Sequence, residues 1–499
     1  MVRAPKLNVT REPAPESWAL LGQRILTDPG FPTAVDGPAP ITGAGDPAQV
    51  APAPGDDPST GVLARLFAHH ETLDARAVAE CLRPIPLSDL EGQGLLARHG
   101  TDVSARFGVE RWGPVLVVHD WPEWHGDPDY VMGTTNAGRS LTWLTPTAPV
   151  GVVLDLGTGC ALQAVMAAHH AHRVVAVDIN ERAVALARAS VLLNGLTNVD
   201  VRHGSWFEPV DGETFDLIVS NPPFVISPEH RLVYRDGGRE GDDLCGELLA
   251  DMAPHLAPGG VAVMLVEWAR RRGEEWSSTP LRWLGELDVD GLGIRYGAMD
   301  PLSYATRWNA AAHDDRRAGE RAVREWLGYY DGLGIDQMYE GVIALRRHLP
   351  GVDRAPASWV MSASRPLNGP GGDQLAAALD GHSTTEGRSG EELLAAVAHP
   401  VEGHSLYQEI GFAGGTYVMG QIRGGFGSGI GVDVVVAPEE LPVILALDGE
   451  RTIGDVLEGV AAGGIGAGPA LDLVVRMAQA GLVELTFPAT GPGSPSIRH

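Results

Sequence analysis

The sequence predicts an α/β protein built around a doubly wound, mainly parallel sheet, with a small α+β module at each end of the chain. Two observations predict the sheet. Apolar runs of strand length end in a polar residue at 152–154, 174–177 and 217–219, which is the pattern of buried parallel strands. Segments with helical periodicity separate these runs, as in a chain that alternates between strands and covering helices.

The first run leads into a glycine turn that predicts a ligand site. Asp155 ends the strand, Gly157, Thr158 and Gly159 form the turn, and a helical pattern follows. Such a turn lets a ligand approach backbone N–H groups at a helix N-terminus. Asp178 ends the second run about 20 residues later, at the spacing expected for a carboxylate that accepts ribose hydroxyls. The pattern indicates a nucleotide-type cofactor.

Charge and cysteine content exclude several classes of protein. The 499 residues carry a formal net charge of −27, so nucleic acid is a disfavoured partner, although a local basic patch stays compatible. Three widely spaced cysteines, Cys81, Cys160 and Cys245, indicate a reducing compartment and provide no zinc pattern. We find neither a signal peptide nor a run approaching about 18 apolar residues. We therefore expect a cytoplasmic protein without metal or membrane contact, and the oligomeric state is left open.

Composition divides the chain into six predicted regions. They are a mobile N-terminal tail or linker (1–60), a winged-helix-like module (61–125), the core domain (126–350), a loop- and glycine-rich β region (351–437), a second winged-helix-like module (438–487) and a disordered tail (488–499).

The winged-helix prediction for the first module depends on three short helices, the third over 87–96, and on a hairpin between 103–107 and 115–118. Each module has two interpretations, capture of a substrate or partner and simple packing against the core. The glycines at 424–429 are expected to form a mobile loop. Because they lack a strand–turn–helix context, we expect no nucleotide there.

Four motifs in order resemble a known enzyme family. DLGTGCA at 155–161, VDIN at 177–180, GSWFEPV at 204–210 and NPPF at 221–224 resemble class I S-adenosylmethionine-dependent N-methyltransferases. More narrowly, they are similar to the group that includes release-factor glutamine methyltransferases and ribosomal-RNA guanine or nucleic-acid adenine methyltransferases. YRDGGREGDDL at 234–244 adds to the likeness. The resemblance implies a Rossmann-like methyltransferase sheet and S-adenosylmethionine as cofactor.

The resemblance also implies which residues bind that cofactor. They are Asp155, Gly157, Thr158, Gly159, Asp178, Ile179, Ser205, Trp206 and Asn221. Ala161 stands where many relatives have a third glycine. Asp178 has a second interpretation as a helix N-cap, and Trp206 has a second interpretation as a core residue.

The NPPF motif is the predicted catalytic element. An amide or exocyclic amine is a poor nucleophile because its nitrogen lone pair is delocalised. The resemblance implies that the side-chain oxygen of Asn221 and the carbonyl of Pro222 accept hydrogen bonds from this NH2 group, while Phe224 stacks on its plane. Two prolines hold the acceptors in place before the substrate arrives. Pro223, Tyr234 and Arg235 are further candidates for contact with the substrate.

The motifs do not identify the methyl acceptor, so three functions stay open. The first is N-methylation of a protein or peptide side chain or of a small molecule. The second is N-methylation of adenine or guanine in RNA or DNA. The third is a non-catalytic protein that senses S-adenosylmethionine and regulates through the flanking modules, which an intact NPPF motif disfavours.

Overall fold

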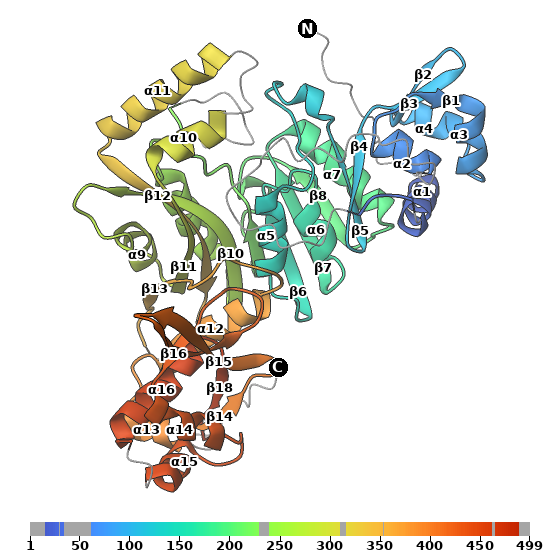
Figure 1. The fold of residues 1–499 in the computed structure, drawn as a ribbon. Coiled ribbons are helices and arrows are strands. Elements are labelled where there is room, and N and C mark those ends of the chain that lie inside the picture. The colour runs from blue at the N-terminus through green and yellow to red at the C-terminus, as the bar shows by residue number, and fades with distance from the viewer. Residues whose placement is uncertain are drawn as a thin grey trace.

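The computed structural model describes residues 15–28, 30–33, 61–228, 239–309, 316–352, 354–461 and 465–488. A central mixed sheet forms the core domain, with one small module beside it and another below it (Figure 1). The predicted α/β class and doubly wound core are therefore confirmed.

The central sheet has eight strands in the order β13-β11-β12-β10-β9-β6-β7-β8. Strands β8, β7, β6, β9 and β10 are parallel, whereas β12 runs antiparallel to both β10 and β11. The chain crosses from β6 to β7 on one side and reaches β9 on the other, which makes β6 the switch point. The strands are β6 (Val150–Leu156), β7 (Ala171–Asp178), β8 (Val199–His203), β9 (Phe215–Ser220), β10 (Leu256–Arg271), β11 (Asp290–Met299), β12 (Ile335–Arg346) and β13 (Ser358–Ser362).

Helices cover both faces of this sheet because alternate strand residues are apolar on both sides. Val153, Val174 and Val219 face the core that α6 and α7 complete, whereas Leu154, Val175 and Ile218 face the core that α8 and α9 complete. The helices of the core domain are α5 (Asn136–Leu144), α6 (Leu162–Ala167), α7 (Glu181–Leu193), α8 (Asp243–Met252), α9 (Ser278–Gly285), α10 (Pro301–Asn309) and α11 (Arg316–Gly332), with short 3-10 turns at Glu208–Val210 and Ala253–His255.

The N-terminal region corrects two predictions. Trp18, Leu21 and Ile25 of α1 are buried in the main core, so the residues of α1 are not part of a mobile linker. The predicted hairpin is also wrong, because β3 pairs with β2, and β5 pairs with β4. The elements here are α1 (Pro15–Thr27), α2 (Val62–Phe67), β1 (Leu73–Asp74), α3 (Ala75–Leu82), α4 (Leu87–Gly92), β2 (Leu96–His99), β3 (Asp102–Ala105), β4 (Gly108–Trp112), β5 (Val115–His119) and a 3-10 turn at Pro122–Trp124.

The third helix of this module is shorter than predicted, since it ends at Gly92 and Leu96 begins a strand. Helices α2, α3 and α4 pack with a three-stranded sheet of order β1-β3-β2. The winged-helix assignment of residues 61–125 stays a prediction. The β4–β5 hairpin lies on α7, where Ser190 accepts the Val118 N–H (2.8 Å) and Asn194 accepts the Leu116 N–H (3.0 Å).

The C-terminal region contains more regular structure than predicted. Helix α12 occupies part of the predicted loop region, and β14 pairs with β18, so the last module extends before residue 438. The elements are α12 (Gly372–Thr385), α13 (Gly390–Ala395), β14 (Val397–Pro400), β15 (His404–Ala413), β16 (Thr416–Phe426), β17 (Val434–Val436), a 3-10 turn at Pro438–Glu440, α14 (Leu441–Ala446), α15 (Ile453–Val460), α16 (Ala467–Gln479) and β18 (Val483–Thr486). A disordered tail was predicted for residues 488–499. Of these, only Pro488 belongs to the described residues, and residues 489–499 lie outside them.

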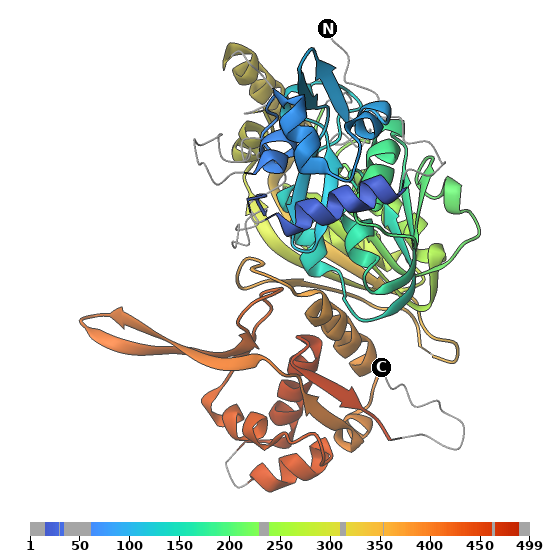
Figure 2. The ribbon, with the colours of Figure 1, turned by 90° about the vertical axis from the view of Figure 1, so that its right-hand side faces the viewer.

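The first half of the glycine-rich stretch, residues 424–426, belongs to a strand, whereas residues 427–429 follow that strand as bends. Gly424 and Gly425 lie in β16 and pair with β15. Strands β15 and β16 continue beyond β17 as a two-stranded arm that projects from the C-terminal module (Figure 2). Ile410 and Met419 pair across this arm, as do Phe412 and Tyr417, and all four side chains are more than half exposed.

Candidate active site

The carboxyl ends of neighbouring strands bring the three predicted motifs together. Leu156, the last residue of β6, is paired with Val177 of β7 and with Ser220 of β9. The glycine turn, Asp178 and Asn221 follow these three residues directly in the chain. The site predicted from the sequence is therefore assembled at one edge of the sheet, at its switch point.

The glycine turn has the conformation that its residues require. Gly157, Gly159 and Ala161 all have positive φ angles, +76°, +54° and +71°. Glycine adopts this region without steric cost, whereas alanine does not. A glycine at position 161 would therefore suit the backbone better than alanine. An added Cβ at Gly157 or Gly159 would meet no atom within 4 Å, so open space for a ligand lies beside the turn.

Asp155 fixes the glycine turn by hydrogen bonds. Its Oδ2 atom accepts hydrogen bonds from the Thr158 hydroxyl (2.6 Å) and the Ala164 N–H (3.0 Å). The side chain is only 1% exposed, and burial raises the pKa of this carboxyl to about 7, with the nearby charge of Asp178 adding to the effect. Asp155 thus joins strand, turn and helix, and its predicted contact with the cofactor stays a prediction.

Asp178 links the end of β7 to the same turn. One carboxylate oxygen accepts the Gly159 N–H (2.8 Å), and the other accepts the Asn180 N–H (2.9 Å). Burial raises the pKa of this carboxyl above its usual range. The N-cap of α7 is Asn180, which accepts the Arg182 N–H, so the N-cap interpretation of Asp178 is wrong. Each oxygen keeps a further lone pair for a ribose hydroxyl.

Three of the predicted cofactor-binding residues, Ile179, Ser205 and Trp206, lie on the side of the site toward β8. Ile179 is 55% exposed although it is apolar, and its carbonyl lies 2.9 Å from His203 Nε2. Trp206 has a φ of +45° and packs partly buried against the hydrophobic core that faces α8. Ser205 is half-buried beside it. Exposed Ile179 is available to a ligand, and Trp206 has a core contact whether or not it also touches one.

The NPPF segment presents an unsatisfied hydrogen-bond acceptor. Among the described residues, the side-chain oxygen of Asn221 is buried without a hydrogen-bond partner. A buried polar atom of this kind costs free energy unless a ligand or water satisfies it. The preceding Ser220 hydroxyl donates to the Leu156 carbonyl (2.9 Å), which fixes the strand end from which Asn221 projects.

The other residues of this segment have defined surroundings. The Pro222 carbonyl already accepts the Phe224 N–H (2.8 Å), which leaves one lone pair for a substrate. Phe224 is half-buried and touches the hydrophobic cores on both faces of the sheet, and Pro223 is also half-buried. Tyr234 and Arg235 lie outside the described residues.

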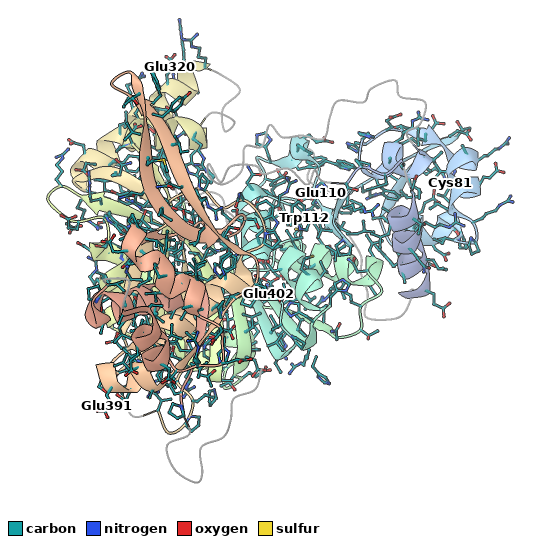
Figure 3. The ribbon with its side chains drawn as sticks, turned by 60° about the horizontal axis from the view of Figure 1, so that its bottom comes forward. Cys81, Glu110, Trp112, Glu320, Glu391 and Glu402 are labelled. Carbon is teal, nitrogen blue, oxygen red and sulfur yellow. The ribbon has the colours of Figure 1, made fainter. Side chains whose placement is uncertain are left out.

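A carboxylate from the N-terminal region was not predicted near the glycine turn. Glu110 of β4 accepts the Thr134 N–H (2.8 Å) and pairs with Arg139 of α5 (3.3 Å). Burial, with the charge of Glu110, raises the pKa of the Cys160 thiol to about 12. Glu110 and Trp112 lie where β4 meets the core domain (Figure 3). No motif marks Glu110, since its proximity depends on how β4 packs.

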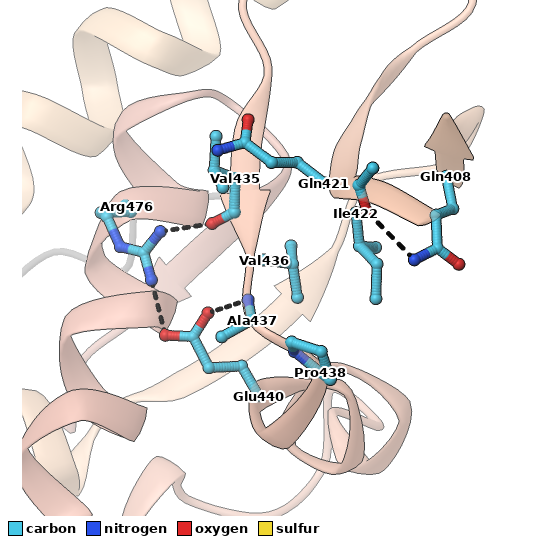
Figure 4. Close-up of a pocket in the computed structure, with 10 residues that line it drawn as sticks. Gln408, Gln421, Ile422, Val435, Val436, Ala437, Pro438, Glu440 and Arg476 are labelled. Carbon is cyan, nitrogen blue, oxygen red and sulfur yellow. Dashed lines mark hydrogen bonds and ion pairs between the residues drawn. The ribbon is translucent and has the colours of Figure 1, made fainter. Parts of the chain in front are cut away.

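A cavity elsewhere in the protein contains none of the predicted residues. It has a volume of about 400 Å³ and is lined by β16, β17 and α16, and Arg476 beside it bonds to Glu440 and to the Val435 carbonyl (Figure 4). Within the described ranges no three His, Cys, Asp or Glu residues gather as a metal site. No helix in those ranges is long and apolar enough to cross a bilayer.

Comparisons with known proteins agree with this site. The methyltransferase small domain family matches residues 137–271. A ribosomal protein uL3 glutamine methyltransferase from Bradyrhizobium diazoefficiens is 36% identical over 31% of this chain and 53% of its own length. A release factor glutamine methyltransferase from Gloeobacter violaceus is 38% identical over 23% of this chain and 45% of its own length.

A third relative is matched over more of its length. A candidate protein N5-glutamine methyltransferase from Methanocaldococcus jannaschii is 31% identical over 27% of this chain and 69% of its own length. The chain spans about half the length of the first two relatives. With the strand order, the glycine turn and the orphaned Asn221 oxygen, these matches show that the chain belongs to the S-adenosylmethionine-dependent class I methyltransferases.

Proposed function

We propose that this protein transfers a methyl group to a side-chain amide nitrogen of another protein. The observation that carries the proposal is the buried, unpartnered side-chain oxygen of Asn221 at the end of β9. An acceptor in that place suits an NH2 group, and an amide presents two such hydrogens. The relatives named above are glutamine methyltransferases, which favours an amide of a protein over other acceptors.

The cofactor site is assigned to the residues around the glycine turn. S-adenosylmethionine, when bound, would supply a methyl group that an attacking nitrogen can take from the sulfonium sulfur, which leaves as a neutral thioether. The backbone of Gly157 and Gly159 and the carboxylate of Asp178 would hold it, since the turn leaves open space and Asp178 keeps free lone pairs. Ile179 offers an exposed apolar surface to a planar base.

The reaction depends on the alignment of the acceptor nitrogen. The side-chain oxygen of Asn221 and the Pro222 carbonyl accept hydrogen bonds from the two N–H groups of the acceptor amide. These bonds draw lone-pair density back to the nitrogen and fix the direction of the lone pair. Phe224 stacks against the amide plane. Holding both reactants in line supplies much of the acceleration. The methylated nitrogen then loses one proton to water, because the proton becomes acidic as the bond between nitrogen and the methyl carbon forms, so no strong base is required.

The test is a labelling experiment with three variants. Purified protein and methyl-labelled S-adenosylmethionine are added to a lysate of cells that lack the gene, and label in protein, RNA and small molecules is counted. We expect label in protein and a loss of about 10²–10³-fold in Asn221→Ala, with cofactor affinity retained. Asn221→Asp keeps an acceptor oxygen and should lose less.

Asn198→Ala is the matched control. Asn198 lies directly before β8, at the end of the sheet opposite to the candidate active site. Its side chain donates hydrogen bonds to the carbonyls of Ala168 and Ala171. This variant should transfer label at the normal rate. Unchanged labelling in Asn221→Ala, or label found only in RNA, would refute the proposal.

A further inference from the structure

The segment behind the NPPF motif is clamped by two buried tyrosines. Ile226, two residues after Phe224, donates its N–H to the Tyr304 hydroxyl (3.1 Å) and accepts a bond from the Tyr330 hydroxyl (2.8 Å). Tyr304 lies on α10 and Tyr330 on α11, and each is 1% exposed. Both polar groups of this backbone unit are therefore held by one helical hairpin, inserted between β11 and β12.

Tyr304 is held in turn by a buried glutamate. Because its oxygen accepts the Ile226 N–H, its own proton is free to donate, and it donates to Glu267 Oε2. Glu267 lies on β10 three positions after Met264, the residue paired with Ser220 at the end of β9. The chain of bonds thus runs from the sheet beside the active site to the backbone that follows NPPF.

Glu267 faces a second carboxylate. It lies directly opposite Glu340 of β12 in the antiparallel register, so the two side chains share one face of the sheet. Both are buried, and Arg307 of α10 pairs with Glu340 (2.9 Å). The other titratable groups near the pair are Tyr304 and Tyr296.

A single proton shared by Glu267 and Glu340 makes the charges of these two carboxyls and Arg307 sum to zero. Burial, with the charge of Glu340, raises the pKa of Glu267 to about 8. When Glu267 is neutral, the negative charge of Glu340 is compensated by the guanidinium of Arg307. Ionisation of Glu267 would leave two carboxylates against Arg307 in a buried site, which is unfavourable.

We propose that Glu267 and Tyr304 are positioning residues: they hold the Ile226 peptide in place and, with it, the backbone that carries Asn221 and Phe224. The inference rests on the function proposed above for Asn221. Neither residue is required to touch substrate or cofactor. Their effect is on how long the acceptor oxygens stay aligned, and therefore on rate rather than on cofactor affinity.

Three variants separate positioning from simple stabilisation. Tyr304→Phe removes the hydroxyl, and we expect the initial rate of label transfer to fall about tenfold, the worth of one hydrogen bond. Cofactor affinity should stay within twofold, and the Ile226 amide should exchange faster with deuterium. Glu267→Ala should behave alike. Glu267→Gln keeps an acceptor for Tyr304 and cannot ionise, so its rate should hold above pH 8, where the wild-type rate falls.

Tyr407→Phe is the control. It removes a hydroxyl bonded to a carboxylate, that of Asp433, in the C-terminal module, and should change neither rate nor exchange at Ile226. If Asn221→Ala is inactive while Tyr304→Phe matches the wild type in rate and exchange, the positioning inference is overturned and the proposed function stands. An identical pH profile in Glu267→Gln and wild type also overturns it. An active Asn221→Ala refutes the proposed function itself, and the exchange data then show only a structural clamp.

Discussion

At the scale of single residues, the site consists of polar atoms whose partners are largely within the protein. Asp155 and Asp178, which were predicted to bind the cofactor, both accept hydrogen bonds from the glycine turn. Only the Asn221 oxygen is buried and, within the described residues of the NPPF segment, left without a partner. The two carboxylates therefore bond within the protein itself, whereas the Asn221 side-chain oxygen has no partner there.

Asp155 should make cofactor binding depend on pH. Its pKa of about 7 means that the carboxyl becomes ionised as the pH rises from 6 to 8. The ionised form attracts a cationic ligand. Affinity for S-adenosylmethionine, measured by titration calorimetry, should therefore rise across this range by up to about tenfold.

Asp155→Asn isolates this effect. Because Oδ2 alone accepts both bonds, one from Thr158 of the turn and one from Ala164 of α6, an amide oxygen can take its place. The variant should bind more weakly at pH 8 and show a flatter dependence on pH. Titration of the ligand itself is common to both proteins, so parallel curves for variant and wild type would contradict the assignment.

At the scale of elements, polar side chains join the N-terminal region to the core. Ser190 and Asn194 of α7 bond to the backbone of β5, which covers the edge of that strand. Nearby, Arg182 of α7 binds Asp120, which follows β5, and its Nε lies 2.7 Å from the carboxylate. Asp120 also accepts the Val131 N–H (3.0 Å), so one buried carboxylate fixes three segments.

Removing the arginine should be costly because Asp120 is 1% exposed. Arg182→Met leaves that charge buried and uncompensated, and we expect the free energy of unfolding to fall by about 3–5 kcal/mol in urea titrations. Arg188→Met is the control on the same helix, where the side chain bonds to the Val201 carbonyl (2.9 Å), and should cost only about 1 kcal/mol. Equal losses in the two variants would argue against a buried ion pair as the link.

At the scale of the whole molecule, the C-terminal module contacts the central sheet at the strand ends that lie opposite to the candidate active site. Asp290, the first residue of β11, accepts bonds from Arg354, from the Ala357 N–H and from Ser383 of α12. Helix α12 also lies against the core through Asp373, which accepts two bonds from Thr147. The module is thus attached to the sheet through α12 by half-buried polar contacts at Asp290 and exposed ones at Asp373.

The charge of the whole chain argues against a nucleic-acid acceptor. A net charge of −27 repels phosphates, and sequence-independent affinity depends on cationic contacts. In gel-shift titrations at about 150 mM salt, we expect tRNA and duplex DNA to bind more weakly than about 10⁻⁴ M. Micromolar binding that weakens steeply with salt would instead restore the nucleic-acid alternative.

The sequence by itself determined the parts whose signal is local. Apolar runs, their spacing and the turn residues predicted the parallel strands, the glycine turn and Asp178, because strand periodicity and turn chemistry are properties of neighbouring residues. The role of the NPPF segment was implied by the family resemblance of a short motif. The carboxyl ends of parallel strands meet at one edge, so the assembly of the site followed from the strand assignment.

Only the tertiary structure decided contacts between residues far apart in the chain. Helix α12 lies within the region that was predicted as loop-rich. A Cβ at Gly381 would lie 1.8 Å from the Ala478 carbonyl oxygen, so glycine there permits close helix packing. Two other contacts between residues far apart in the chain were also decided by the tertiary structure: Glu110 lies near Cys160 of the glycine turn, and Glu267 lies opposite Glu340. Such pairings depend on strand register and on packing, which local residue patterns do not encode.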